Sequence, residues 1–383
     1  MRNDVLLLAG FYLPGYKGGG PVRTIKNLVD CLKTEFCFSI LTADRDLGES
    51  SSYAGISANQ WIDQDGVFLC YISSDLSWPL RLWCLLRKYD GDALHLNSFF
   101  SIRFSIVPLL IWRVLKPRKP IILGPRGEFS IGALGLKSFK KRVFLKCVKL
   151  SGIYRSVVWH ASSEFEVADI RRTIGEDVNI HIAIDIAKPP DAIVLVKRNA
   201  ARPLQLCFLS RISSIKNLLG ALQMLQQVQS PVTFVAYGPI EDATYWVQCQ
   251  AAASQLPSHI QFEYRGPLHP AQVPQALAQH DLFFLPTLGE NFGHVIAEAL
   301  GCGLPVLISD ATPWRNLSAQ RLGADLPLDA PERFVDFIES CSQMPAADYD
   351  AWRQEIRAWA LKNIGNEEAV EQSRQLYRSV LAS

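Results

Sequence analysis

The sequence contains no apolar run long enough to cross a membrane. A spanning helix needs about 20 consecutive apolar residues, and the best candidate, residues 101–115, is interrupted by Arg103, Pro108 and Arg113. The nine cysteines are scattered, and no two have the C-x-x-C spacing that is typical of redox and zinc sites. No His/Asp cluster has the spacing of metal ligands. We therefore expect reduced thiols, a cytosolic location and no metal cofactor.

Glycine is concentrated near the start of the chain, but not in the pattern of a dinucleotide site. Residues 5–9 read as a buried strand, a glycine run follows at residues 18–20, and Pro21 suits the first turn of a helix that runs to about Lys33. The G-x-G-x-x-G spacing of Rossmann dinucleotide sites is not met. Glycines between a strand and a helix bring backbone N–H groups close to a ligand, which predicts an anion site. The alternative is a loop that binds nothing.

Length and composition indicate two α/β domains. The chain has 383 residues, of which 49% are hydrophobic and 20% charged, so it can bury two cores. Apolar runs alternate with helical stretches, which favours mainly parallel sheets covered by helices. Strands are expected at residues 36–43, 67–72, 93–96, 120–124, 157–161, 204–209, 232–239, 259–264, 281–286 and 304–309. We expect domains at residues 1–187 and 204–365, a linker at 188–203 and a final helix at 366–383.

Charge is divided unevenly between the two halves. Residues 1–185 hold 24 Lys and Arg against 18 Asp and Glu, whereas residues 186–383 hold 15 against 19. The net charge of the whole chain is only +2. The two halves are therefore expected to face different partners.

Residues 287–310 carry the strongest indication of function. The apolar runs at residues 281–286 and 304–309 flank a short helical stretch, which indicates a parallel βαβ unit. Such units bind ligands beyond the carboxyl ends of their strands. Glu290 falls at this place, before the helix, and Glu298 lies inside the helix.

These two carboxylates suit a ligand that is rich in hydroxyl groups. Ionised carboxylates accept paired hydrogen bonds from neighbouring hydroxyls. In a continuous helix, Glu290 and Glu298 would lie about 12 Å apart, which is about the reach from a ribose to a sugar folded back over its diphosphate. The N–H groups of Asn291, Phe292 and Gly293 would meet the phosphates between them. The alternative is an ordinary acid at a helix entry and a buried acid with another partner.

Further candidate ligands lie at other strand ends in the second half. Arg211 and Lys216 flank the loop between a strand and a helix, where two cations and helix N–H groups suit a diphosphate. Solvated basic residues in a loop are the alternative. Gly238 ends the next strand, and the turn at Arg265 and Gly266 ends the one after it. Backbone groups in that turn could contact the edge of a nucleobase.

The first half offers candidates for binding an acceptor. His95 and Asn97 follow one expected strand, and Arg126 and Glu128 lie in a glycine-rich loop after another. Loops at strand ends often carry function, and glycines permit a close approach. His95 lies within an apolar strand, so a core histidine with internal partners is the alternative to a catalytic one.

Residues 136–150 form a basic amphipathic stretch with no acid. Such a helix suits electrostatic contact with anionic lipid headgroups, although a solvated face over an ordinary core is the alternative. Nucleic acid is not expected, because no basic platform interleaved with aromatic residues accompanies the stretch. The apolar positions at helical spacing are Leu136, Phe139, Val143, Phe144, Cys147 and Leu150, and the basic residues are Lys137, Lys140, Lys141, Arg142, Lys146 and Lys149.

The pattern E-N-F-G-x-x-x-x-E followed by A-L-G-C-G-L-P-V resembles the E-x7-E region of retaining glycosyltransferases with the GT-B fold, in particular glycosyltransferase family 4. The glycine loop, the cation pair, the Arg-Gly turn and the glutamate segment occur in the family's order over nearly the whole chain. The resemblance implies two Rossmann-like domains that face a central cleft, and a C-terminal helix that crosses back to the N-terminal domain. It implies ribose binding by Glu298, sugar binding by Glu290, diphosphate binding by Arg211 and Lys216, and close approach to the reaction centre by Gly19 and Gly20.

The sequence departs from the family at two places. The family usually has glycine before the arginine and after the lysine, where this chain has Ser210 and Asn217. The loop that often carries a histidine near the acceptor reads P-R-G-E here, which leaves that role open between Arg126, Glu128 and neither. The surrounding run P-R-G-E-F-S-x-G-A-L resembles family members that serve bacterial surface polysaccharide assembly.

We therefore expect a metal-independent, retaining glycosyltransferase. Its donor would be a nucleoside-diphosphate sugar, and its acceptor a lipid-linked or growing saccharide of an O-antigen, capsule or exopolysaccharide. Arg211 and Lys216 would stabilise the charge on the leaving diphosphate, and Glu290 would hold the sugar. The protein would act in the cytoplasm, attached to the inner membrane surface through residues 136–150. The alternatives are a non-catalytic sugar-nucleotide or polysaccharide binding protein on the same fold and a GT-B epimerase.

Overall fold

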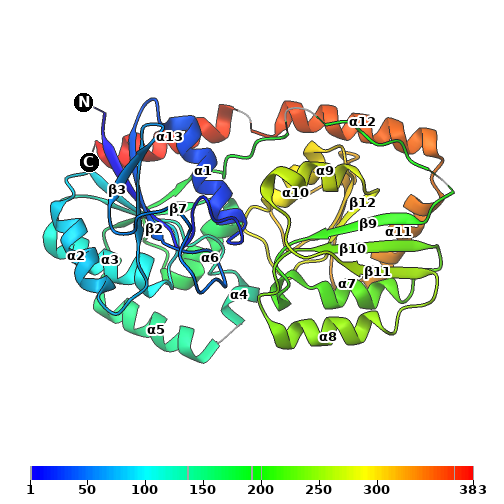
Figure 1. The fold of residues 1–383 in the computed structure, drawn as a ribbon, viewed down its shortest axis with the longest axis horizontal. Helices are drawn as coiled ribbons and strands as arrows, with labels where there is room; N and C mark the ends of the chain where they lie inside the picture. Colours follow the sequence, from blue (N-terminus) through cyan, green and yellow to red (C-terminus); the bar gives the residue numbers. More distant parts are fainter. Residues whose placement is uncertain (1, 136–137, 191–192, 200, 366, 383) are drawn as a thin grey trace. The chain divides into compact units, whose positions relative to one another are not determined.

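The computed structural model describes residues 2–135, 138–190, 193–199, 201–365 and 367–382. The chain divides into two units (Figure 1). The N-unit comprises residues 1–186 and 367–383, and the C-unit comprises residues 187–366. The last helix of the chain therefore belongs to the first unit, as the resemblance implied.

The N-unit is built on an eight-stranded sheet with the order β3-β4-β2-β1-β5-β6-β7-β8. The strands pair in parallel except for the β3–β4 hairpin. The predicted strands of this half are confirmed, and β3 and β8 were not predicted. The strands are β1 (Asp4–Leu8), β2 (Cys37–Ala43), β3 (Trp61–Gln64), β4 (Val67–Ile72), β5 (Ala93–Leu96), β6 (Ile121–Leu123), β7 (Val157–Ala161) and β8 (Ile180–Ile182).

Helices cover both faces of this sheet, which explains why its strands are almost wholly apolar. On one face, Leu82, Trp112, Val148 and Ile170 come from four helices and share one core. The other face carries α1 and α13, which lie side by side (Figure 1). The helices of the N-unit are α1 (Gly20–Leu32), α2 (Trp78–Lys88), α3 (Val107–Leu115), α4 (Ile131–Gly135), α5 (Ser138–Ser151), α6 (Glu164–Ile174) and α13 (Glu367–Leu381), and a π-helical turn (Ile102–Ile106) leads into α3.

The predicted glycine loop and helix are confirmed at the carboxyl end of β1. Gly19 is the residue before α1 and has a positive φ of 72°, which only glycine adopts readily. Pro21 lies in the first turn of α1, where its missing N–H leaves no helical hydrogen bond unmade.

The described part of the basic stretch lies in helix α5 (Ser138–Ser151), but the predicted apolar stripe is partly wrong. Phe144 packs against Phe99, and Val148, which was not assigned to the stripe, is buried. Val143 and Leu150 are 48% and 87% exposed, and Cys147 is also exposed. The core below α5 selects the side that carries Phe144 and Val148. Leu136 and Lys137 lie outside the described residues, as do the side chains of Phe139 and Lys140.

The C-unit contains a six-stranded parallel sheet with the order β11-β10-β9-β12-β13-β14. The order reverses between β9 and β12, which is the place where open α/β sheets bind their ligands. The strands are β9 (Leu204–Leu209), β10 (Val232–Tyr237), β11 (Ile260–Tyr264), β12 (Leu282–Leu285), β13 (Val306–Ser309) and β14 (Gly323–Leu326). The helices are α7 (Leu218–Leu225), α8 (Ala243–Ala253), α9 (Val273–Ala278), α10 (His294–Gly301), α11 (Pro331–Gln343) and α12 (Ala346–Asn363), with short 3-10 turns at Ser214–Lys216 and Pro270–Gln272.

The predicted βαβ unit is confirmed as β12, α10 and β13, whose strands pair in parallel with Phe283 opposite Val306. The helix begins only at His294, so Glu290 lies in the preceding loop. The 12 Å estimate for Glu290 and Glu298, which assumed continuous helix, therefore does not apply.

Helix α13 is anchored on the N-unit by aromatic and ionic contacts. Its Tyr377 ring packs 5.3 Å from that of Phe36, and Arg374 lies 2.8 Å from Glu35. None of the helices in the part of the chain that the structure describes is long and apolar enough to cross a membrane.

Candidate active site

The donor-side residues predicted from the sequence lie at one edge of the C-unit sheet. They follow four neighbouring strands, β11, β10, β9 and β12. Because these strands are parallel, their carboxyl ends meet at the same edge. Arg211 and Lys216 follow β9, Gly238 follows β10, Arg265 and Gly266 follow β11, and Glu290, Asn291, Phe292 and Gly293 follow β12, with Glu298 in α10.

Lys216 and Glu290 form an ion pair at the switch point of the sheet. The Lys216 Nζ lies 2.7 Å from Glu290 Oε2, and the two side chains are only 10% and 15% exposed. The other carboxylate oxygen of Glu290 accepts a hydrogen bond of 3.2 Å from the N–H of Asn291. A cation and a carboxylate that were predicted to bind adjacent groups of one ligand are therefore neighbours.

The loops that carry this pair are joined by hydrogen bonds. The hydroxyl of Thr287 and the N–H of Leu288 both donate to the carbonyl of Ile215, at 2.9 and 2.8 Å. The Asn217 side chain donates to the carbonyl of Pro286 at 2.8 Å. These contacts fix the loop after β9 to the loop after β12. Thr287 is fully buried and was not predicted to contribute.

Asn217 occupies the position after the lysine where the family usually has glycine. Its backbone is left-handed, with φ 57° and ψ 42°. Asparagine tolerates this conformation better than most residues with a side chain. Its side chain also accepts a hydrogen bond from the N–H of Gly220 and so caps α7. The departure therefore retains the backbone geometry that glycine would allow.

Gly238 allows two backbone segments to approach closely. A Cβ at this position would lie 1.9 Å from the carbonyl oxygen of Ser210, and its φ is 137°. Its N–H donates to the carbonyl of Gly266 at 2.9 Å. The loops after β9, β10 and β11 are thus held together by main-chain contacts.

The two arginines of the site form partly exposed ion pairs with glutamates. Arg211 Nη1 lies 2.8 Å from both carboxylate oxygens of Glu241, and its side chain is 34% exposed. Arg265 binds Glu263 and donates to the hydroxyl of Tyr237 at 3.3 Å. Glu241 was not predicted from the sequence, and its position after β10 is the only local signal for it.

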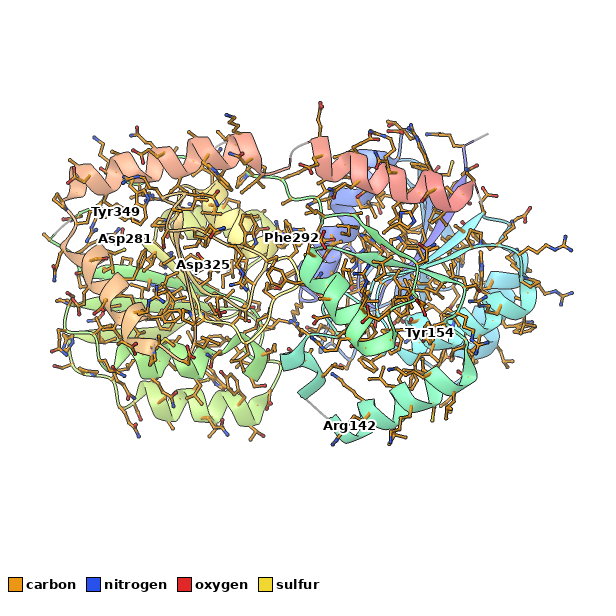
Figure 2. All side chains as sticks on the ribbon, turned by 180° about the vertical axis from the view of Figure 1, so that it is seen from behind. Arg142, Tyr154, Asp281, Phe292, Asp325 and Tyr349 are labelled. Carbon is orange, nitrogen blue, oxygen red and sulfur yellow. The ribbon has the colours of Figure 1, made fainter. Side chains whose placement is uncertain are left out.

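The start of α10 is enclosed by aromatic residues. Phe292 (labelled in Figure 2) packs against both His294 and Trp314, with ring centroids 4.8 and 5.9 Å away. The indole N–H of Trp314 donates to the carbonyl of Phe292 at 2.6 Å. Gly293 is left-handed, and a Cβ there would lie 2.8 Å from Ile296 Cδ1. Trp314 was missed, although it lies in the loop after β13, at the same edge of the sheet.

Glu298 is 8% exposed and lies within α10. The first N–H groups of this helix have no helical acceptor, which makes its start suitable for an anion. The α10 start and Lys216 therefore offer positive charge at the edge where Glu290 offers a carboxylate.

In the N-unit, Arg126 lies in a buried polar network. Its Nη1 is 2.8 Å from Asp185, and these side chains are only 5% and 3% exposed. Its Nη2 donates to Asn97 Oδ1 at 2.8 Å. His160, which was not predicted, lies 3.3 Å from the same nitrogen, and burial together with the Arg126 charge lowers its pKa to about 3. Asn97 and Arg126 are thus brought together, while Gly19 and Gly20 follow β1 in the same unit.

Glu128 and His95 have internal partners. Glu128 accepts hydrogen bonds from the N–H groups of Phe99 and Phe100, at 2.6 and 3.0 Å, and burial raises its pKa. His95 is fully buried, lies 2.9 Å from the Tyr377 hydroxyl, and has its pKa lowered well below the ordinary value by burial. This geometry favours a positioning role for both residues over contact with an acceptor.

The chain has four Asp-x-Asp triplets, which begin at Asp44, Asp63 and Asp90 in the N-unit and at Asp348 in the C-unit. In the first, Asp44 is paired with Arg45 at 2.9 Å, and Asp46 accepts hydrogen bonds from backbone N–H groups. In the second, Asp63 accepts a hydrogen bond from Gly66 in the β3–β4 turn. Among the residues outside the gaps in the structure, no three His, Cys, Asp or Glu side chains are grouped to hold a metal ion. Metal independence stays a prediction.

Part of the chain is similar in sequence to known glycosyltransferases. Residues 196–343 match the family described as glycosyl transferases group 1, and this range contains all the donor-side residues of the C-unit. The O-antigen chain mannosyltransferase B of Escherichia coli is 28% identical over 144 residues, which are 37% of this chain. The match spans only 35% of that protein's length.

Solved structures resemble the chain over its whole length. HepE of Anabaena, in complex with UDP and glucose, has a TM-score of 0.70 at 14% identity, with 100% of both chains covered. Sucrose-phosphate synthase from Thermosynechococcus elongatus has a TM-score of 0.71 at 14% identity, again with 100% of both chains covered. Both are GT-B glycosyltransferases. The chain therefore has the GT-B fold, and the match of residues 196–343 supports a group 1 glycosyltransferase.

Proposed function

We propose that this protein is a retaining, metal-independent glycosyltransferase of family 4. It moves a sugar from a nucleoside-diphosphate sugar to a lipid-linked or growing saccharide during assembly of a bacterial surface polysaccharide. The match to the group 1 family supports the reaction class, and the partial match to an O-antigen mannosyltransferase supports the pathway class. HepE of Anabaena, which has been solved in complex with UDP and glucose and with UDP-glucose, supports a nucleotide-sugar donor.

The ion pair between Lys216 and Glu290 is the observation that carries this proposal. In a nucleoside-diphosphate sugar, the anomeric carbon is bonded directly to an oxygen of the β-phosphate. A cation that holds the phosphate and a carboxylate that holds the sugar must therefore be neighbours. Their separation of 2.7 Å at the switch point of the sheet meets this requirement.

The remaining donor-side residues fit a nucleoside-diphosphate sugar bound in this orientation, with its phosphate at Lys216 and its sugar at Glu290. Glu298 in α10 binds the ribose hydroxyls, and the turn at Arg265 and Gly266 contacts the nucleobase. The N–H groups at the start of α10 and the Arg211 guanidinium share the diphosphate with Lys216. Arg211, the turn at Arg265 and Gly266, and the start of α10 each follow the carboxyl end of one of the neighbouring strands, and Glu298 lies further along α10.

In this mechanism, catalysis depends mainly on fixed positive charge that stabilises the leaving phosphate. The bond between the anomeric carbon and the β-phosphate oxygen breaks, and negative charge builds on the phosphate. Lys216 stabilises this charge most strongly in the transition state, because it is already in place and shielded from water. An acceptor hydroxyl attacks from the face that the phosphate leaves, forms the new C–O bond, and passes its proton to the leaving phosphate.

We also propose that the protein acts at the cytoplasmic surface of the inner membrane. A lipid-linked acceptor is found there, and α5 exposes Arg142, Lys146 and Lys149 with no acid in the helix. Each exposed Lys or Arg near an anionic surface can contribute about 1 kcal/mol to binding. This contact should weaken as salt is raised, because the charges are screened.

Donor turnover by a panel of nucleotide sugars tests the reaction, with release of the nucleoside diphosphate as the measurement. Lys216→Ala should lower the rate with the preferred donor by about 100- to 1,000-fold, because one preorganised group is lost. Lys362→Ala, which removes an exposed lysine from the last turn of α12, is the matched control and should leave the rate unchanged. A rate that is the same in Lys216→Ala as in the parent protein would refute the diphosphate assignment. Donor binding without any turnover would favour the non-catalytic alternative.

A further inference from the structure

Helix α2 carries apolar side chains on its outer side as well as on its buried side. Leu82 and Leu86 are 1% exposed and belong to the core of the N-unit. On the outer side, Leu80 is 73% and Trp83 is 37% exposed, and Leu76, just before the helix, is 100% exposed. A surface helix normally presents polar residues to water. A helix that is apolar on both sides is expected to have its outer side covered.

The neighbouring helix α3 has the same property. Leu110 and Val114 are spaced four residues apart, so they share one side of the helix, and they are 43% and 69% exposed. Ile102, in the turn before α3, is 65% exposed. Helices α2 and α3 pack side by side (Figure 1). We call the outward apolar residues of the two helices the α2–α3 face, which comprises Leu76, Leu80, Trp83, Ile102, Leu110 and Val114.

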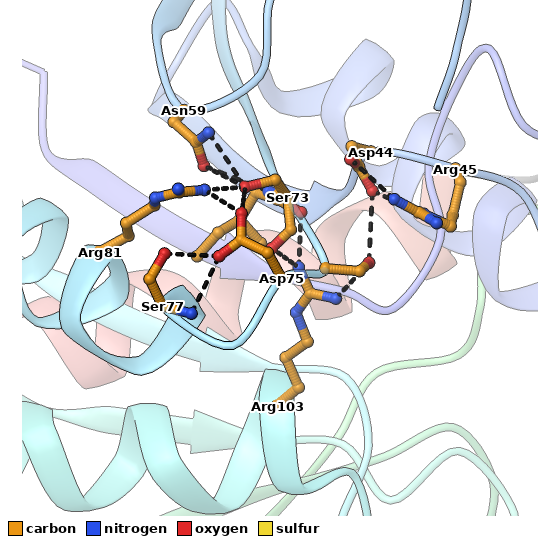
Figure 3. A network of polar contacts seen from close by, with 10 residues as sticks. Asp44, Arg45, Asn59, Ser73, Asp75, Ser77, Arg81 and Arg103 are labelled. Atoms are coloured by element: carbon orange, nitrogen blue, oxygen red, sulfur yellow. Dashed lines mark hydrogen bonds and ion pairs between the residues drawn. The ribbon is translucent and has the colours of Figure 1, made fainter. Parts of the chain in front are cut away.

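The loop that presents Leu76 is braced by polar contacts (Figure 3). Arg103 donates to two carbonyl groups at the end of β4, at 2.5 and 2.6 Å, and to the hydroxyl of Ser74 at 2.7 Å. Asp75 binds Arg81 at 2.6 Å and accepts the N–H of Ser77 at 2.9 Å. Leu76 is therefore held in a defined position although its side chain contacts water. Such preorganisation lowers the entropy that must be lost when a surface binds.

The same side of the N-unit is strongly basic. Helices α2, α3 and α5 cover one face of the sheet, because their inward residues share one core. Residues 74–163, which include α2, α3 and α5, contain sixteen Lys and Arg against four acids. Of these acids, Asp75 is paired with Arg81, Asp90 lies 3.2 Å from Lys119, and Glu128 is occupied by internal hydrogen bonds. Arg142 is labelled on α5 in Figure 2. The exposed basic residues on or beside these helices are Arg87, Lys88, Arg118, Arg142, Lys146 and Lys149.

We propose that the α2–α3 face docks on an anionic lipid bilayer, with Leu76, Leu80 and Trp83 inserted at the level of the headgroups. Tryptophan and leucine bordered by lysine and arginine suit this interface, since the apolar groups enter the lipid and the cations meet its phosphates. The α5 contact is electrostatic, whereas this face adds an apolar anchor that salt does not screen. This inference deepens the proposed function and rests on its membrane location.

Vesicle flotation with the full-length protein tests the inference. The parent protein should float with vesicles that contain phosphatidylglycerol and bind phosphatidylcholine vesicles much more weakly. Combined replacement of Leu76, Leu80 and Trp83 by serine should weaken binding to the anionic vesicles by about tenfold or more, because several large apolar groups no longer enter the lipid. Leu76→Ser is a second, milder variant, because its side chain is 100% exposed and does not hold the fold together. The matched control is Val247→Ser with Leu361→Ser, which removes two exposed apolar residues from the C-unit.

Several outcomes would overturn the inference. Flotation of the triple variant that equals that of the parent would exclude insertion of this face. Absence of parent flotation on anionic vesicles would exclude the lipid as partner. A parent that is dimeric and a triple variant that is monomeric would assign the face to a second copy of the chain.

Donor turnover in the same preparations separates this inference from the proposed function. If the inference alone fails, the enzyme turns over its donor but the variants float normally. If the glycosyltransferase assignment alone fails, no donor is consumed while flotation still depends on Leu76, Leu80 and Trp83. Turnover of the donor by the triple variant also shows that it is folded.

Discussion

Replacing Lys216 by methionine should destabilise the C-unit by about 3 kcal/mol, because the carboxylate of Glu290 would lose its cation in a largely buried place. The two side chains are 10% and 15% exposed and 2.7 Å apart. Removing one partner of a buried ion pair costs about 3–5 kcal/mol, and the residual contact of both groups with water places this pair at the lower end. Glu290→Gln should destabilise by a similar amount, since Lys216 would then be the buried charge without a carboxylate.

The double variant Lys216→Met/Glu290→Gln separates stability from activity. With both charges removed, no buried charge is left uncompensated, so its stability should lie within about 1 kcal/mol of the parent. The coupling free energy between the two sites should be at least about 2 kcal/mol. Donor turnover should nevertheless stay as low as in the single variants, because the diphosphate and the sugar would both have lost a ligand.

The measurement is urea denaturation, with a separate transition allowed for each unit because the chain divides into two compact units. Lys362→Met is the control, since it removes an exposed lysine of the same unit and should change the free energy of unfolding by less than about 0.5 kcal/mol. If the effects of Lys216→Met and Glu290→Gln simply add in the double variant, the two residues are not coupled. Such a result would show that the ion pair between Lys216 and Glu290 does not stabilise the C-unit.

Three further predictions concern single residues. Gly238→Ala should destabilise the C-unit by about 1–3 kcal/mol and lower donor turnover, because its Cβ would lie 1.9 Å from the carbonyl oxygen of Ser210; parent-like urea midpoints would contradict this. Asn217→Gly and Asn217→Ala both lose the side-chain hydrogen bonds with Pro286 and Gly220, but Asn217→Ala should cost about 1–2 kcal/mol more in the same assay, because alanine disfavours the left-handed backbone; equal values would contradict this. His160 has its pKa lowered from 6.5 to about 3, so the unfolded chain binds its proton first and the folded N-unit loses stability as pH falls from 6.5 towards 3. The stability advantage of the parent over His160→Asn should therefore shrink by about 2 kcal/mol between pH 7 and pH 5, and a constant difference in urea denaturation would refute it.

Much of the fold was predictable because parallel sheets covered on both faces leave a simple pattern in the sequence. Their strands are continuous apolar runs, and β1, β2, β4 and β5 were found in this way. Three strands were missed, and each lacks such a run. β14 (Gly323–Leu326) has only four residues, which include a glycine and an aspartate. β3 lies at the edge of the sheet and is mostly exposed, and β8 has only three residues, none of them fully buried.

For the basic helix α5, the spacing of apolar residues was not sufficient to predict the buried side. The spacing of apolar residues predicted a helix correctly, but it did not predict which apolar residues face inward. Phe144 packs inward and Val143 and Leu150 are exposed, because the shape of the core below decides which side of the helix is covered. The exposed apolar residues of α2 were not predicted, because the sequence alone does not distinguish an exposed leucine from a buried one.

The sequence determined the positions of the donor-side residues along the chain, because a ligand site at the edge of a parallel sheet must lie where a strand ends and a loop begins. Only the tertiary structure decided which of those loops meet. Lys216 and Glu290 are 74 residues apart and Arg211 and Glu241 are 30 residues apart, yet each pair is in contact. The order of strands brings them together, and that order depends on packing between distant segments, which no local pattern of residues records.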